Sequence, residues 1–151
     1  MTTLKAFDVD IKNPYFCSED GVLFTKNKDK LVHYPASKAE QFYTIPNTVI
    51  RCLFSCFTDT KNLNFLVVPE SVVYFESAAF LKCNSIKNIT VFRHPRQEKI
   101  KFLGTNFSET TFQKENITYI YPPHDLKTCK NIMLNQLHNF PINVFILMVE
   151  S

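Results

Sequence analysis

Two stretches of the chain repeat one pattern around a proline. Residues 42–57 are FYTIPNTVIRCLFSCF and residues 65–80 are FLVVPESVVYFESAAF. Aligning Pro46 with Pro69 gives a sequence offset of 69 − 46 = 23, and the match continues on both sides. The equivalent pairs are Ile45 and Val68, Val49 and Val72, Phe57 and Phe80, Leu63 and Ile86, and Leu66 and Ile89. Sustained similarity at one offset indicates internal repeats.

Each repeat is predicted to combine a strand with a returning arc. Residues 63–68, LNFLVV, favour a strand, and Pro69 ends it because proline has no N–H for the ladder. Val72, Phe75, Ala78 and Phe80 are expected to line the inside of the arc. A repeat period of this length predicts a short leucine-rich-repeat solenoid of α/β type, whose neighbouring units share one core. We expect a parallel sheet of about five strands, one per repeat, with irregular or short helical arcs.

Less regular units flank this pair. Leu4, Phe7 and Val9 predict a first strand, and Ile117 and Ile120 a last one. The interval from Ile86 to Ile117 is 117 − 86 = 31, so this unit is expected to carry about eight inserted residues, which we place in the charged loop 93–102.

Two further segments complete the predicted organisation. Residues 20–35 hold two apolar runs around TKNKDK and predict a β-hairpin insert. The solenoid is then expected to span residues 1–123. Residues 124–151 are predicted to form a capping tail, with Asp125 as the N-cap of a helix.

Composition narrows the class of protein. Hydrophobic residues make up 45% of the chain, enough for a core, and the net charge is only +3. This mild balance, with basic and acidic residues interleaved, argues against nucleic acid as a partner. Residues 1–15 are not typical of a signal peptide, and the apolar run 144–149 is too short to span a bilayer. The sequence alone therefore indicates no membrane insertion and a cytoplasmic location by default.

The pattern NPYFCSEDGVLFTKNKDKLVHYPASKAEQFYTIPNTV, followed by AAFLKCNSIKNITV, resembles the BspA-like leucine-rich repeat family. The likeness covers roughly residues 4–123. Its repeat positions are filled here by Val68-Pro69, Glu70-Ser71, Val72, Ala79-Phe80, Cys83 and Ile86, and its hairpin insert by Asp20-Gly21-Val22-Leu23. The resemblance implies a non-enzymatic, protein-binding repeat linked with cell-surface adhesion and surface antigens. The family usually has glycines in the arc, whereas this chain has two glycines in all.

Residues that carry chemistry form no convincing site in the sequence. Cys52 and Cys56 lie four apart but lack a second ligand pair, so no metal site is predicted, and buried thiols are the preferred interpretation. Cys129 with His124 or His138 is the basis of an alternative hypothesis, a cysteine-dependent hydrolase, although nothing in the sequence orients them. We expect no enzymatic activity and no cofactor.

The remaining candidate site is the outer face of the sheet. Strand side chains alternate, so if Leu66 and Val68 point inward, Phe65 and Val67 point outward. Stacked repeats then form two outward columns. The first contains Ala6, Phe42, Phe65, Asn88 and Tyr119, and the second Asp8, Thr44, Val67, Thr90 and Tyr121.

Exposed aromatic residues favour a protein or peptide partner. The predicted partner-binding residues are Phe42, Phe65, Val67, Asn88, Tyr119 and Tyr121, with the four aromatics forming one stripe. Two structural interpretations compete with this one. Aromatic pairs across strands also stabilise sheets, and the C-terminal tail is a candidate cover for the face. A further alternative is a fragment of a larger repeat array that self-associates through its ends.

Overall fold

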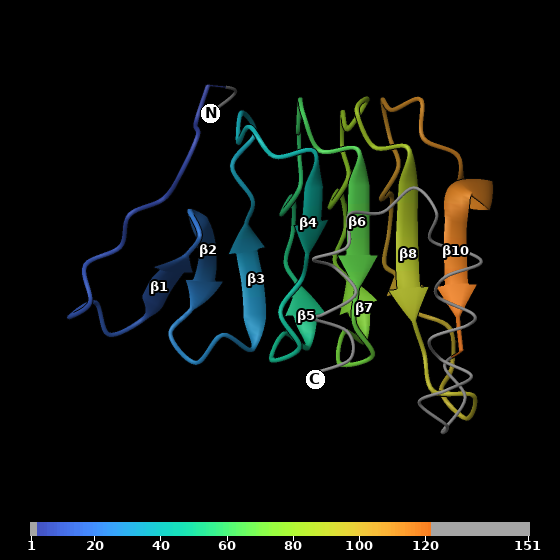
Figure 1. Cartoon of the computed structure of the whole chain (residues 1–151), viewed down its shortest axis with the longest axis horizontal. Helices are drawn as coiled ribbons and strands as arrows, with labels where there is room; N and C mark the ends of the chain where they lie inside the picture. The colour runs from blue at the N-terminus through green and yellow to red at the C-terminus, as the bar shows by residue number, and fades with distance from the viewer. Residues whose placement is uncertain (1–2, 122–151) are drawn as a thin grey trace.

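The computed structural model describes residues 3–121 as a β-solenoid whose two sheets enclose one core (Figure 1). A four-stranded parallel sheet has the order β10-β8-β6-β4. Its strands are β4 (Phe42–Thr44), β6 (Phe65–Val68), β8 (Asn88–Phe92) and β10 (Ile117–Ile120). The predicted leucine-rich-repeat solenoid with a parallel sheet is confirmed.

The second sheet shows that the arcs contain strands. Its order is β1-β2-β3-β5-β7-β9. Its parallel part consists of β3 (Lys30–His33), β5 (Arg51–Cys52), β7 (Tyr74–Phe75) and β9 (Lys101–Phe102). Within residues 3–121 the one helical element is the 3₁₀ turn η1 (Lys114–Asn116), and no helix is long and apolar enough to cross a membrane. Each regular repeat therefore contributes a longer strand to one sheet and a two-residue strand to the other.

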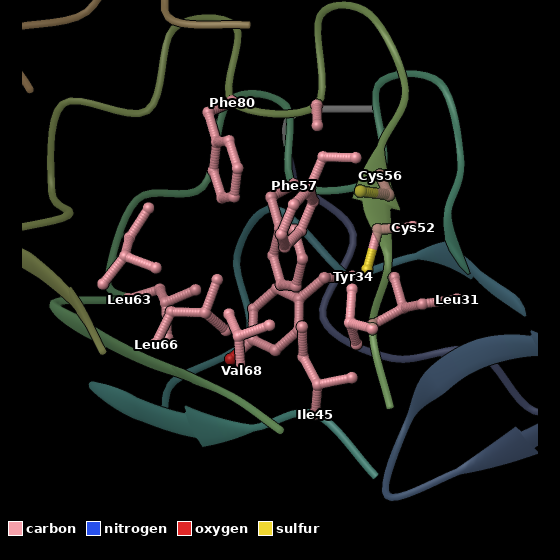
Figure 2. Packing of buried hydrophobic residues seen from close by; sticks show 14 of the residues in the cluster. Leu31, Tyr34, Ile45, Cys52, Cys56, Phe57, Leu63, Leu66, Val68 and Phe80 are labelled. Atoms are coloured by element: carbon pink, nitrogen blue, oxygen red, sulfur yellow. The ribbon is translucent and has the colours of Figure 1, made fainter. Parts of the chain in front are cut away.

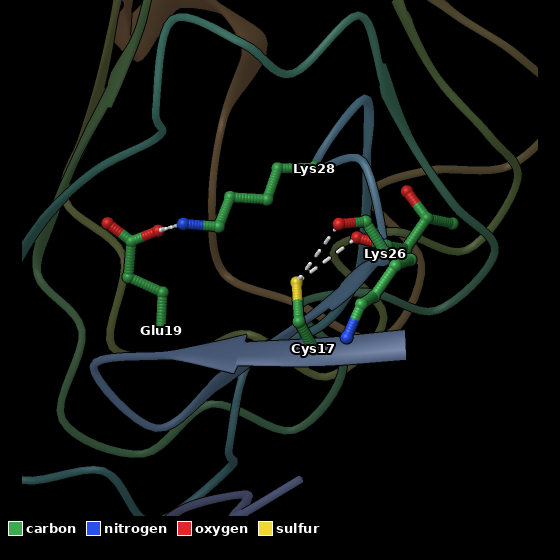
Figure 3. Close-up of polar contacts among 5 residues, drawn as sticks. Cys17, Glu19, Lys26 and Lys28 are labelled. Atoms are coloured by element: carbon green, nitrogen blue, oxygen red, sulfur yellow. Dashed lines mark hydrogen bonds and ion pairs between the residues drawn. The ribbon is translucent and has the colours of Figure 1, made fainter. Parts of the chain in front are cut away.

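The hairpin insert is confirmed and is larger than predicted. β1 (Phe16–Glu19) and β2 (Val22–Thr25) are antiparallel, as are β2 and β3. Figure 3 shows the exposed ion pair between Glu19 and Lys28, and the Cys17 thiol directed at the carbonyl oxygens of Thr25 and Lys26. Gly21 makes the first turn at φ +74°, and a Cβ there would lie 2.9 Å from that of Ala6. This turn therefore requires glycine.

The predicted first strand around Leu4–Phe7–Val9 does not form. Instead, the Phe7 N–H donates to the Gly21 carbonyl at 2.8 Å, and the Leu4 carbonyl accepts from the Ser37 N–H at 2.8 Å. The backbone of this segment is therefore hydrogen-bonded to the hairpin turn and to Ser37, and it does not pair with β4. In the part of the chain that the structure describes, the parallel sheet has four strands, not about five.

The predicted register of the last strand is also wrong. Ile117 pairs with Ile89, so the repeat interval is 117 − 89 = 28, and five residues are inserted rather than eight. The other two intervals are 65 − 42 = 23 and 88 − 65 = 23, because Phe42 pairs with Phe65 and Phe65 with Asn88. The exposed residues 95–99 account for most of the insertion, which lies in the loop where the sequence placed it. A three-residue shift is odd in number, so it exchanges the two faces of β10.

An aromatic ladder runs through the core. Tyr34, Phe57, Phe80 and Phe107 stack in sequence, with neighbouring ring centroids 5.4, 5.5 and 5.3 Å apart. Figure 2 shows Phe57 between Tyr34 and Phe80. The spacing of these four positions in the sequence follows the repeat, and the first three side chains are almost fully buried. The ladder joins each unit to the next, because its rings pack in the offset or tilted arrangements that aromatic pairs favour.

The arcs reach their tight conformation largely without glycine. Ser55, Ala78 and Gly104 occupy one recurring left-handed position, at φ 56°, 58° and 62°. Asp59 and Lys82 occupy a second, and they are separated by one regular repeat interval. A left-handed residue with a side chain costs about 1 kcal/mol or more, so packing of the arc must offset this strain.

A buried asparagine, Asn106, supports the arc that follows β9. Asn106 is 3% exposed; its Oδ1 accepts from the Ala79 N–H at 3.2 Å and its Nδ2 donates to the Leu103 carbonyl at 2.6 Å. Asn106→Ala is expected to lower the free energy of unfolding by about 2–3 kcal/mol, because both backbone groups lose their partner. Chemical denaturation followed by circular dichroism measures it. The control is Asn84→Ala, at an exposed asparagine that accepts from the Thr111 N–H. A loss of unfolding free energy no larger than that of Asn84→Ala would show that Asn106 does not support the arc.

Candidate functional site

The four-stranded sheet has an inward and an outward face. Leu66 and Ile89 pair in one inward column, and Val68 and Val91 in the next; all four belong to the core cluster. The intervening side chains therefore point away from the core. We define the outward face as Phe42, Thr44, Phe65, Val67, Asn88, Thr90, Phe92, Thr118 and Ile120, none of which belongs to that cluster.

Two columns of the outward face can be followed from strand to strand. In the first, Phe42, Phe65 and Asn88 are in register, as the sequence predicted. All three side chains are half-buried. In the second, Val67 pairs with Thr44 on one side and Thr90 on the other. The structure thus brings together four of the six predicted binding residues, namely Phe42, Phe65, Val67 and Asn88.

Tyr119 and Tyr121 do not extend this face. Tyr119 pairs with Val91, an inward residue, and packs against the core. Tyr121 follows β10 and is 42% exposed; its ring is stacked on that of Tyr119 at 6.4 Å. The predicted stripe of four aromatics is therefore interrupted after Phe65. The partner-binding role of the six residues stays a prediction.

A polar cluster lies where the stripe was expected to continue. The Asn88 side-chain amide donates to the Asn116 carbonyl at 2.9 Å and to the Thr118 hydroxyl at 3.1 Å. Its oxygen accepts from the Thr90 hydroxyl at 2.9 Å. These bonds link β8 to β10. The outward face thus has an apolar half around β4 and β6 and a hydrogen-bonded half around β8 and β10.

Burial on this face is deeper than the sequence predicted. Val67 and Thr90 are each 1% exposed, Ile120 3% and Phe92 7%. The Thr44 hydroxyl is buried without a hydrogen-bond partner. Sequence reasoning placed Val67 and Thr90 outward, but strand alternation predicts only the direction of a side chain and not how deeply it is buried.

The cysteines of the core fit structural roles. Cys52, Cys56 and Cys83 are fully buried and unpaired in disulfides. Burial raises the pKa of the Cys83 thiol to about 11 and that of Cys56 well above its usual value. Cys83 donates to the Phe57 carbonyl at 2.6 Å. Residues 3–121 contain no group of three His, Cys, Asp or Glu side chains that could hold a metal ion.

Thiol labelling checks this assignment. Because the thiolate is the reactive form, iodoacetamide is expected to modify half-exposed Cys17 readily and Cys52, Cys56 and Cys83 only as the protein unfolds. Mass spectrometry of peptides after timed labelling gives each rate. Cys129, with His124 and His138, lies outside the described residues. A Cys129 rate far above that of Cys17 would support the hydrolase hypothesis, and fast labelling of Cys83 in folded protein would contradict the core assignment.

Comparison with known families identifies the N-terminal part of the chain. A family model described as "Baseplate hub distal subunit" matches residues 2–90, more than half of the 151 residues. The chain belongs to the baseplate hub distal subunit family. The family match covers the hairpin insert and the strands up to Thr90 in β8. No curated protein matches the chain in sequence.

Solved structures show the same fold. A leucine-rich repeat protein from Eubacterium ventriosum is 24% identical, with a TM-score of 0.50 over 61% of this chain and 31% of that one. The pneumococcal vaccine antigen PcpA is 17% identical, with a TM-score of 0.51 over 89% of this chain and 48% of that one. The chain thus spans a third to a half of these neighbours. They show a leucine-rich-repeat fold and do not single out the BspA-like family.

Proposed function

We propose that the chain is a protein-binding repeat module that contacts a protein or peptide partner through the apolar half of its outward face. The observation that carries the proposal is the register of Phe42 with Phe65, beside Val67 and outside the core cluster. Aromatic side chains aligned on a broad sheet suit a macromolecular partner, and such anchors dominate binding energies at interfaces.

The family suggests the assembly in which this binding takes place. Membership of the baseplate hub distal subunit family supports a subunit that holds neighbouring proteins together in a phage baseplate hub. The second candidate is an adhesion or surface-antigen protein. It is supported by the BspA-like pattern around Val68-Pro69 and the hairpin at Asp20-Gly21, and by the fold shared with a vaccine antigen.

The third candidate is a segment of a longer array. β9 and β10 are the last strands of their sheets in residues 3–121, and each neighbouring structure is at least twice as long as the part matched here. Unpaired strand edges favour stacking on a further unit. Self-association through these ends would be its signature.

The experiment uses the intact chain as bait, with two matched variants. Phe65→Ala changes the outward face, and Phe54→Ala changes a 64%-exposed phenylalanine of an arc. We expect wild type and Phe54→Ala to retain the same partner and Phe65→Ala to lose it. Baseplate proteins among the retained partners support the hub function, host-surface proteins the adhesion function, and the chain alone the array. Equal retention by all three baits would rule out this face as the binding site.

A further inference from the structure

The second sheet carries a column of basic residues on its outer side. Leu31, Cys52 and Phe75 of this sheet belong to the core cluster, so the residues directly before them point away from the core. Strand pairing places these neighbours in register, in what we define as the basic column: Lys30, Arg51, Tyr74 and Lys101. Because the two sheets enclose one core, this column lies on the opposite side of the molecule from Phe42 and Phe65.

Two cations of the basic column lack a carboxylate partner. Lys30 and Arg51 lie opposite each other on neighbouring strands, where like charges destabilise a sheet. Neither forms an ion pair within residues 3–121, whereas Lys101 pairs with an exposed glutamate at 3.3 Å. The carboxylates of Asp29 and Glu76 accept hydrogen bonds from a threonine hydroxyl and a backbone N–H. The column therefore presents positive charge that this part of the chain does not neutralise.

The Arg51 guanidinium is held over an aromatic ring. Its central carbon lies 5.5 Å from the centroid of the Tyr74 ring on the next strand, a favourable cation–π distance. A guanidinium held by its face still presents its N–H groups at its edge, in the planar fork that fits a carboxylate. The ring thus orients exposed Arg51 before any ligand arrives, which reduces the entropy lost on binding.

Exposed apolar side chains flank the basic column. Ile50 and Val73, each directly before a member of the column, are 45% and 47% exposed. They are neighbours, because the Val73 N–H donates to the Ile50 carbonyl at 2.8 Å. Leu103, directly after β9, is 44% exposed. Arginine, tyrosine and exposed apolar residues gathered on one face are typical of a protein interface.

We propose that this face docks a partner protein through an acidic segment that also carries apolar side chains. The segment supplies the carboxylates that Lys30 and Arg51 lack within residues 3–121, and its apolar side chains cover Ile50 and Val73. A phosphate backbone offers nothing to the apolar flank, so this occupant fits better than nucleic acid. The site goes beyond the binding proposed for the outward face, because it uses the other sheet and needs no contact with Phe65.

Selection from a library of random displayed peptides, with the intact chain as bait, tests the chemistry of the occupant. Excess Tyr74→Ala protein, shown to be folded by circular dichroism, is present in solution to remove peptides that bind elsewhere on the chain. We expect the surviving peptides to carry an excess of Asp and Glu interspersed with apolar residues. Survivors of neutral or positive charge, or no survivors, would overturn the proposal. Cosedimentation with phosphatidylserine vesicles without surviving peptides would assign the face to a membrane surface instead.

Charge reversal then locates the binding site of the strongest surviving peptide. Arg51→Glu should raise its dissociation constant at least about tenfold, measured by fluorescence anisotropy of the labelled peptide. Added salt should also weaken its binding to the wild type. The matched control is Arg96→Glu, the same change at an exposed arginine of the loop 95–99. This control and Phe65→Ala should each change the dissociation constant less than about threefold.

The outcomes for the two faces can be told apart. Equal effects of Arg51→Glu and Arg96→Glu would overturn the basic column as a docking site. Loss of peptide binding in Phe65→Ala would place the peptide on the outward face and overturn it as well. If Arg51→Glu does not fold, Lys30→Glu makes the same reversal on the neighbouring strand. Peptide binding that depends on Arg51 and not on Phe65 supports this site, whether or not the outward face binds a partner.

Discussion

Replacement of Phe57 by alanine is expected to lower the free energy of unfolding by about 3–5 kcal/mol. The side chain is fully buried at the centre of the aromatic ladder. Its ring contacts Tyr34 at 5.4 Å, Phe80 at 5.5 Å and Phe75 at 6.5 Å. The substitution leaves a cavity that joins two repeats, and rigid neighbours cannot fill it.

Urea denaturation followed by circular dichroism measures this cost. Phe54→Ala is the matched control, because Phe54 is 64% exposed three residues earlier in the same arc. Its effect should stay within about 0.5 kcal/mol, the range usual for surface substitutions. Equal destabilisation by the two changes would show that the ladder does not hold the repeats together.

The second large effect is expected on binding. If the outward face is the contact surface, Phe65→Ala should weaken the partner's affinity by about 2 kcal/mol or more, which is roughly 30-fold. Phe65 lies between Phe42 and Asn88 in register, so it occupies the middle of the first column. Its loss removes an aromatic anchor without touching the core.

Calorimetric titration of the purified partner measures this change in affinity. Tyr74→Ala is the control, since Tyr74 is a half-buried aromatic of the opposite sheet. It should change the affinity less than about threefold. An affinity of Phe65→Ala within that same range would mean that the face exists but does not carry the function.

Sequence reasoning succeeded where the repeat is regular. The pairs Phe57–Phe80 and Leu66–Ile89 share one sequence offset, and both occupy equivalent core positions. The same offset relates Tyr34 to Phe57, so the ladder's first member could also have been found. Buried repeat positions leave a periodic signal because every unit must supply the same shape to its neighbour.

Sequence reasoning failed where an inserted loop or a very short strand removes the periodic signal. The sequence comparison aligned Ile117 with Ile86, whereas the structure pairs it with Ile89. Because this shift is an odd number of residues, it placed Tyr119 on the wrong face of the sheet. The strands β5, β7 and β9 have two residues each, too few for a visible alternation. Asn106 supports its arc through backbone hydrogen bonds, which depend on local geometry rather than on hydrophobic pattern.

The assignment of the two faces underlies the proposed function, and neighbouring residues test it most directly. Leu66 belongs to the core cluster, whereas Phe65, one residue before it, lies on the outward face. Urea denaturation of Leu66→Ala and Phe65→Ala should give losses of about 2–5 kcal/mol for the first and at most about 1 kcal/mol for the second. Equal losses, or a larger loss for Phe65→Ala, would place Phe65 in the core and contradict the account.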